Sequence, residues 1–183
     1  MIVFHINDTS SGKHAFTSMM LKQHFRSYHP LSYDVMYPET SMRDMIINIE
    51  KLNVYNEDIV IVGSSLGGWF ANRIAKTLKC SLVLFNPILN PQEALSTMGS
   101  YSAASYVVFG DTRKLANVPT SLLVSIDDEV IDFRKTVELY APTDASIKYT
   151  TGGHLPTDKN SHLLIKEINK FDPDLPILFD ITD

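Results

Sequence analysis

The chain has 183 residues, of which 44% are hydrophobic and 20% are charged, and its formal net charge is −5. This length and composition predict one globular domain over residues 1–183, large enough to bury a sizeable core. The 16 Lys and Arg residues form no basic stripe along the chain, which argues against nucleic acid as a partner.

The predicted elements alternate between short apolar strands and amphipathic helices. In chain order we expect strands at 2–6, 31–36, 58–62, 82–85, 122–126 and 146–150, and helices at 13–25, 41–52, 66–78, 91–98, 132–139 and 158–171. Ser41 and Asp44 form the pattern of a capping box. The alternation favours fold class α/β, a three-layer α/β/α sandwich with a mostly parallel sheet. Functional groups of such a sheet lie in loops beyond the carboxyl ends of its strands.

The most informative segment follows the predicted strand 58–62. It reads Gly63-Ser64-Ser65-Leu66-Gly67, which is the pattern G-x-S-x-G between a buried strand and a helix. This context is the one that a nucleophile elbow requires, and the glycines let the strand and the helix pass closely. We therefore predict Ser65 as a nucleophile, with the backbone N–H of Leu66 donating to an oxyanion.

A nucleophilic serine needs a histidine base and a carboxylate that orients the base. The late strand 122–126 is followed by Asp127, Asp128 and Glu129, and the last predicted strand is followed by Gly152-Gly153-His154. In this fold the chain order is serine, acid, histidine, so His154 is the predicted base. Asp128 is the preferred acid, with Asp127 and Glu129 as competitors.

The remaining features set the expected environment. The single Cys80 excludes an intramolecular disulfide and is typical of a reducing compartment. The sequence contains no run of eighteen apolar residues, so no membrane span is predicted. The first residues also lack the pattern of a secretory signal, and we therefore expect a cytoplasmic protein. The histidines show no metal-binding spacing, and neither a metal nor a cofactor is expected.

These motifs together resemble a small single-domain α/β-hydrolase, and most closely the bacterial YqiA/YcfP-type esterase-like family, UPF0227. The resemblance is carried by the strand that ends at His5, the elbow, the segment 84–91 with Asn86-Pro87, the Asp-Glu-Val block at 128–130, and Gly152-Gly153-His154. It implies a compact hydrolase fold with no large lid and a Ser-His-Asp triad with Asp128 as the acid. It also places the second oxyanion donor on the backbone N–H of Asn7.

The expected function is hydrolysis of a carboxylic ester, or a thioester, of a small or accessible acyl substrate through an acyl-enzyme. Ile6 stands where the family has glycine. This departure favours an alternative of another class, a hydrolase-fold binding protein with weak or no activity. Three further segments bear on the expected function. The loop 7–14 departs from a phosphate-binding loop at both ends, so nucleotide binding is not expected. The connection 90–117 is expected to shape a fairly open pocket, and the tail 172–183 has no assigned role.

Overall fold

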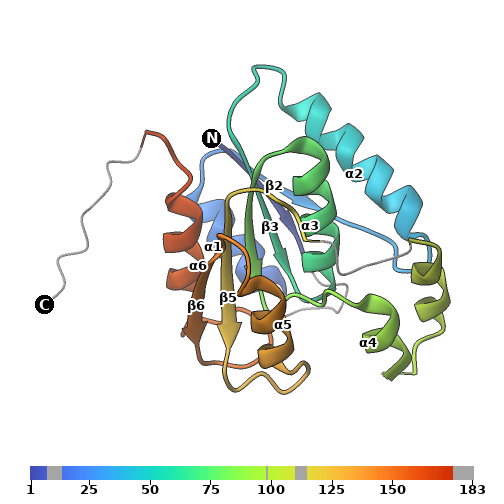
Figure 1. Cartoon of the computed structure of the whole chain (residues 1–183). Helices are drawn as coiled ribbons and strands as arrows, with labels where there is room; N and C mark the ends of the chain where they lie inside the picture. Colours follow the sequence, from blue (N-terminus) through green and yellow to red (C-terminus); the bar gives the residue numbers. More distant parts are fainter. Residues whose placement is uncertain (8–13, 98, 110–114, 175–183) are drawn as a thin grey trace, which may run out of the picture.

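A computed structural model describes residues 1–7, 14–97, 99–109 and 115–174 (Figure 1). At its centre lies a six-stranded sheet with the order β2-β1-β3-β4-β5-β6, in which every neighbouring pair of strands is parallel. The strands are β1 (Ile2–Ile6), β2 (Tyr28–Leu31), β3 (Ile59–Ser64), β4 (Ser81–Phe85), β5 (Thr120–Ser125) and β6 (Ser146–Thr150).

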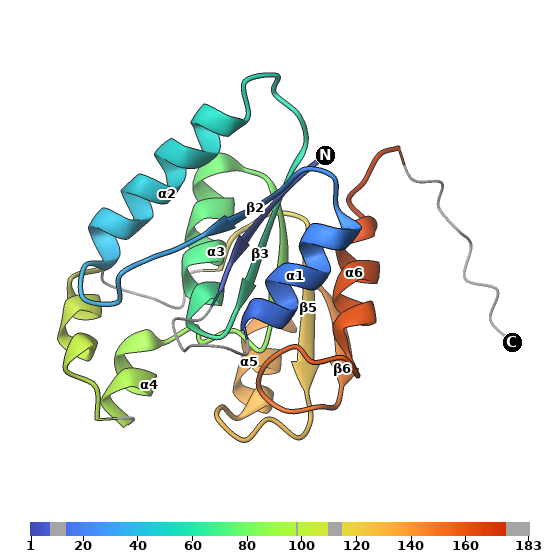
Figure 2. The same ribbon diagram turned by 180° about the vertical axis from the view of Figure 1, so that it is seen from behind.

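Helices cover both faces of this sheet, as Figures 1 and 2 show from opposite sides. One face carries α1 (His14–His24) and α6 (Ser161–Asn169), and the other carries α2 (Pro38–Leu52), α3 (Leu66–Leu78) and α5 (Phe133–Tyr140). Two further elements, α4 (Pro91–Thr97) and the 3-10 helix η1 (Tyr101–Phe109), lie between β4 and β5. The predicted three-layer α/β/α class is thereby confirmed.

Side-chain alternation along the strands divides the core into two parts. In β1, Val3 packs with α1 and α6 residues such as Leu21 and Leu164, whereas Phe4 packs with α2 and α3 residues such as Met45. Because successive side chains of a strand point to opposite faces, strands buried on both faces read as continuous apolar runs. This explains why the central strands were recognisable in the sequence.

The prediction of a strand at 31–36 is wrong, because β2 spans Tyr28–Leu31 and pairs with β1 from Val3↔Tyr28 to Ile6↔Leu31. Residue 30 is a proline, a residue that sheets tolerate at an edge, and β2 is one of the two edge strands. Residues after Leu31 are buried in another way. The Tyr33 ring packs on Phe70 at a centroid distance of 4.3 Å, so this loop also contributes to the core.

The capping box at Ser41 is also wrong. Helix α2 begins three residues earlier, at Pro38, a residue whose fixed φ and missing N–H suit the first turn of a helix. The Ser41 hydroxyl lies inside the helix and accepts a hydrogen bond from the backbone N–H of Asp34 at 2.8 Å. It therefore closes the loop before the helix rather than capping the helix.

The predicted helix 66–78 is present with the same ends as α3, and the remaining predicted helices are present with shifted ends. The helix near 91–98 corresponds to α4, and that at 158–171 is shortened to α6 because Asn160 forms its N-cap position. Among the described residues, no helix is long and apolar enough to cross a membrane. The interpretations placed on the loop 8–13 and on the tail 175–183 concern residues outside those that the structure describes.

Candidate active site

The predicted site residues lie at one edge of the sheet, where the parallel strands end. Ser65 follows β3, Asp128 follows β5 and His154 follows β6. Asn86 follows β4 at the same edge. The carboxyl ends of neighbouring parallel strands meet there, which is where open α/β sheets bind their ligands.

Ser65 occupies a strained turn between β3 and α3. Its backbone has φ 51° and ψ −129°, a conformation that residues other than glycine rarely adopt. The turn is held by the next strand: the Ser65 N–H donates to the Phe85 carbonyl at 3.2 Å, and the Ile88 N–H donates to the Ser65 carbonyl at 2.8 Å. The nucleophile elbow predicted from the sequence therefore has the expected strand, turn and helix.

Glycines on either side of the serine allow this turn to form. A Cβ atom on Gly63 would overlap the Cβ of Ala71 in α3, and a Cβ on Gly67 would overlap the carbonyl oxygen of Ile6. The start of α3 consequently lies directly against the backbone that leaves β1. Only a residue without a side chain fits at both positions.

Replacing Gly67 with alanine should destabilise the fold by about 3 kcal/mol or more, because the added methyl group meets backbone that cannot rotate away. Gly99→Ala is the matched control. Gly99 has a positive φ of 70°, unlike the helical Gly67, but an added Cβ there meets nothing within 4 Å, so only about 1–2 kcal/mol of backbone strain is expected. Urea unfolding of both variants measures the difference, and equal losses would contradict the close approach of α3 to β1.

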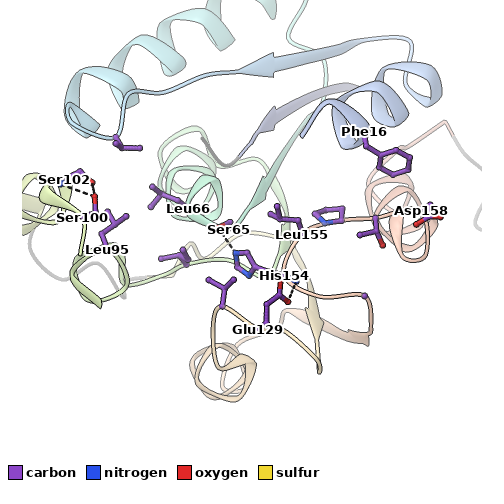
Figure 3. Close-up of a pocket in the computed structure, with 16 residues that line it drawn as sticks. Phe16, Ser65, Leu66, Leu95, Ser100, Ser102, Glu129, His154, Leu155 and Asp158 are labelled. Carbon is purple, nitrogen blue, oxygen red and sulfur yellow. Dashed lines mark hydrogen bonds between the residues drawn. The ribbon is translucent and has the colours of Figure 1, made fainter. Parts of the chain in front are cut away.

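The structure brings Ser65, His154 and Asp128 together in one chain of hydrogen bonds. Figure 3 shows its hydrogen bond between Ser65 and His154. The His154 Nε2 atom lies 2.8 Å from the Ser65 hydroxyl, and its Nδ1 atom lies 2.8 Å and 3.0 Å from the two Asp128 carboxylate oxygens. The side chain of His154 is 6% exposed and that of Asp128 is fully buried. Water is thus largely excluded from both hydrogen bonds of the imidazole.

The two competing carboxylates lie near His154 but bind backbone instead. Asp127 accepts hydrogen bonds from the N–H groups of Gly152 and Gly153 at 3.0–3.2 Å, and Glu129 accepts one from the His154 N–H at 3.0 Å. Both glycines have positive φ values, of 118° and 83°. The three consecutive acids therefore have different partners. Asp128 faces the imidazole, and its two neighbours bond the backbone of the loop that carries His154.

Hydrogen bonds from the Gly152 and Gly153 N–H groups hold the pKa of the Asp127 carboxyl below its usual value. A group whose pKa is lowered on folding stabilises the fold above its unfolded pKa, about 3.9, and loses that effect as pH falls through the folded value. We therefore expect Asp127→Asn to lower the melting temperature at neutral pH. The difference from the native protein should shrink below about pH 4. A difference that grows on acidification would contradict this role.

The two predicted oxyanion donors come from segments that the structure places side by side. Leu66 is the first residue of α3, where backbone N–H groups have no partner within the helix. Asn7 directly follows β1, whose end packs against Gly67, and its side-chain amide donates to the Ser18 hydroxyl at 2.7 Å. The Ile6 side chain is fully buried in the core.

Two buried asparagines organise this edge of the sheet, and no role was predicted for either. Asn86 is fully buried; its side-chain amide donates to the carbonyls of Gly153 and His154 and accepts from the Ser125 N–H. Asn160 is 1% exposed; its amide donates to the Thr151 carbonyl and accepts from the Thr157 N–H. The asparagine-proline segment in the sequence pointed to Asn86, whereas nothing in the local sequence distinguished Asn160.

A pocket of about 880 Å³ opens over the Ser65–His154 pair. Figure 3 shows Leu95, Ser100 and Ser102 on one side of this pair, and Leu155 and Asp158 on the other. Most of the lining is apolar. It comes from α1, the start of α3, α4 and the loops after β2, β4, β5 and β6: Phe16, Val35, Leu66, Ile88, Leu95, Val130, Leu155 and Pro156. The segment between β4 and β5 shapes one wall, as expected.

Comparison with known proteins assigns the chain to a family. The sequence model described as "Uncharacterised protein family (UPF0227)" matches residues 1–171. The chain belongs to the UPF0227 family. A UPF0227 protein of Yersinia enterocolitica is 26% identical to it over 139 residues, which make up 73% of this chain and 77% of that protein.

Solved structures similar to this UPF0227 protein have the α/β-hydrolase fold. Est1E from Butyrivibrio proteoclasticus superposes with a TM-score of 0.71 at 13% identity, covering 93% of this chain and 86% of Est1E. A monoacylglycerol lipase from Paleococcus ferrophilus gives 0.63 at 16% identity, covering 92% of both chains. The thioesterase domain from the curacin biosynthetic pathway gives 0.61 at 13% identity, covering 93% and 90%. These likenesses show the fold.

Proposed function

We propose that this UPF0227 protein is a serine hydrolase that cleaves carboxylic esters or thioesters through an acyl-enzyme. The observation that carries the proposal is the hydrogen-bonded chain from Asp128 through His154 to Ser65 at the wall of an apolar pocket. Similarity of fold to a lipase and to a thioesterase domain supports this class of reaction. The single cysteine is consistent with a cytoplasmic setting.

In the proposed mechanism, the Ser65 hydroxyl attacks the substrate carbonyl carbon while His154 Nε2 takes its proton. Asp128 holds the imidazole in the tautomer whose Nε2 can accept that proton, and it stabilises the imidazolium that forms. The backbone N–H groups of Leu66 and Asn7 donate to the oxyanion of the tetrahedral intermediate. When the intermediate collapses, the bond to the leaving group breaks and His154 returns the proton to the departing alcohol or thiol.

The second half of the reaction removes the acyl group from Ser65. Water gives a proton to His154 and attacks the acyl carbon, and the carboxylic acid leaves as Ser65 recovers its proton. The pocket favours small-molecule substrates with an apolar acyl part, because residues such as Leu95, Ile88 and Leu155 surround the serine. The proposed partner is accordingly a small acyl ester or thioester.

A panel of p-nitrophenyl esters and matched acyl thioesters of increasing chain length tests the proposal. Ser65→Ala serves as the control. We expect turnover by the native protein, with kcat/KM rising by up to about fourfold for each methylene until the pocket is filled. Folded protein that binds these compounds in the pocket without turnover would instead support the alternative, a hydrolase-fold binding protein.

A further inference from the structure

The loop that carries His154 is attached to the sheet on its buried side by one side chain. Asn86 lies directly after β4, is fully buried, and donates from Nδ2 to the carbonyl oxygens of Gly153 at 3.0 Å and His154 at 2.9 Å. Its Oδ1 atom accepts a hydrogen bond from the Ser125 N–H at 2.7 Å. Every polar atom of this amide group therefore has a backbone partner close to the proposed triad.

These contacts continue the hydrogen bonding of the sheet beyond the end of β4. The register of β4 with β5 ends at Phe85↔Leu123, and the Asn86 N–H donates to the Leu123 carbonyl at 3.0 Å. Beyond this point the Asn86 side chain continues the hydrogen bonding, to Ser125 at the end of β5 and to the loop after β6. Ser125 in turn accepts a hydrogen bond from the Asp128 N–H at 3.3 Å.

The same segment also holds the serine. Phe85 and Ile88, on either side of Asn86-Pro87, bond the backbone of Ser65, and Pro87 packs against Gly68 at the start of α3. Asn86 itself has φ 41°, a left-handed conformation in which asparagine is the most readily accommodated residue after glycine. The four residues 85–88 thus contact the backbone of Ser65 and His154 directly, and they reach Asp128 through Ser125.

Only asparagine provides the required groups at this position. Two carbonyl oxygens face its amino group and one N–H faces its oxygen, so the site needs two donors and one acceptor. A carboxylate has the acceptor without the donors, and an apolar side chain has neither. The glycines at 152 and 153 allow the loop many conformations, and the exposed acids Asp127 and Glu129 bond only its N–H groups.

We propose that Asn86 is the residue that positions His154, by fixing the backbone of Gly153 and His154 relative to the end of β5. The predicted effect of Asn86 on turnover rests on the proposed function. Its effect on geometry can be measured without a substrate. Loss of the amide should let the imidazole shift away from Ser65 and Asp128 while the pocket keeps its walls, so kcat falls and KM changes little.

Two substitutions separate this role from a purely structural one. Asn86→Asp keeps the volume and the acceptor but removes both donors to Gly153 and His154. Asn86→Gly removes the whole side chain yet suits the positive φ, so it is the second choice if the buried carboxylate prevents folding. Asn72→Ala is the matched control. Asn72 is equally buried, and its oxygen bonds the Ala116 N–H and the Tyr140 hydroxyl instead.

The direct readout is the downfield proton NMR signal of the His154 Nδ1–H bound to Asp128, recorded for each folded variant. We expect both Asn86 variants to lose or shift this signal and to lower kcat about 10- to 100-fold with less than about threefold change in KM. Asn72→Ala should keep the signal and the native kcat. Folded Asn86 variants with the native signal would overturn the proposal. A native protein without turnover would refute the proposed hydrolysis, while the signal would still decide the role of Asn86.

Discussion

Ser65→Gly is expected to abolish hydrolysis and yet to give a more stable protein than Ser65→Ala. Both variants lack the nucleophile, so kcat/KM should fall by at least about 10⁴-fold. They differ in backbone strain, because alanine keeps a Cβ at φ 51° and ψ −129° and glycine does not. We therefore expect Ser65→Gly to exceed Ser65→Ala in free energy of unfolding by about 1 kcal/mol.

The sign of this difference is informative, because a glycine variant ordinarily has a lower free energy of unfolding than the alanine variant at the same position. Ala75→Gly supplies the comparison: Ala75 is buried in the last turn of α3, where glycine should cost about 1 kcal/mol. Urea unfolding of the three variants measures both effects, and ester hydrolysis measures the activities. If Ser65→Gly were less stable than Ser65→Ala, the strained elbow would be contradicted.

Asp128→Asn is expected to lower kcat by about 10³- to 10⁴-fold, while Asp127→Asn lowers it by less than about tenfold. An asparagine at 128 can turn its amino group toward His154 Nδ1 and so favour the tautomer in which Nε2 cannot accept the Ser65 proton. An asparagine at 127 keeps an oxygen that accepts from Gly152 and Gly153, so the loop retains its position.

Asp127→Asn and Asp128→Asn are a matched pair, because they make the same change at neighbouring positions. Steady-state kinetics on a single ester, with circular dichroism to establish folding, is sufficient to compare them. Equal losses from Asp127→Asn and Asp128→Asn would contradict the assignment of Asp128 as the orienting acid. A greater loss from Asp127→Asn would move that role to the neighbouring carboxylate.

The elbow and the order of the site residues could be predicted because their signals are local. Gly63 and Gly67 flank Ser65 within one turn, and the strand before them is a continuous apolar run. Asp128 and His154 each follow a strand, so the parallel topology alone brings them to one edge of the sheet. The choice between Asp127 and Asp128 depended on which carboxylate faces the imidazole, and neighbouring residues in a loop do not encode that direction.

The features that the sequence did not reveal depend on distant contacts. The partners of the Asn86 side chain lie 39, 67 and 68 residues further along the chain, so no local pattern marks its role. The predicted bounds of strand β2 were wrong because the apolar residues after Leu31 serve the core from a loop, where the Tyr33 ring packs on Phe70. Ser41 resembles a cap by its residue type, but its hydroxyl bonds Asp34 across the preceding loop.

The central claim is that Ser65 is a nucleophile activated by His154, and fluorophosphonate labelling followed by intact-mass measurement tests it most directly. This probe reacts with activated serines and needs no knowledge of the natural substrate. We expect one adduct on the native protein, mapped to Ser65 by peptide mass, with none on Ser65→Ala and strongly slowed labelling of His154→Ala. A folded native protein that gains no adduct, or gains it on another residue, would contradict the claim.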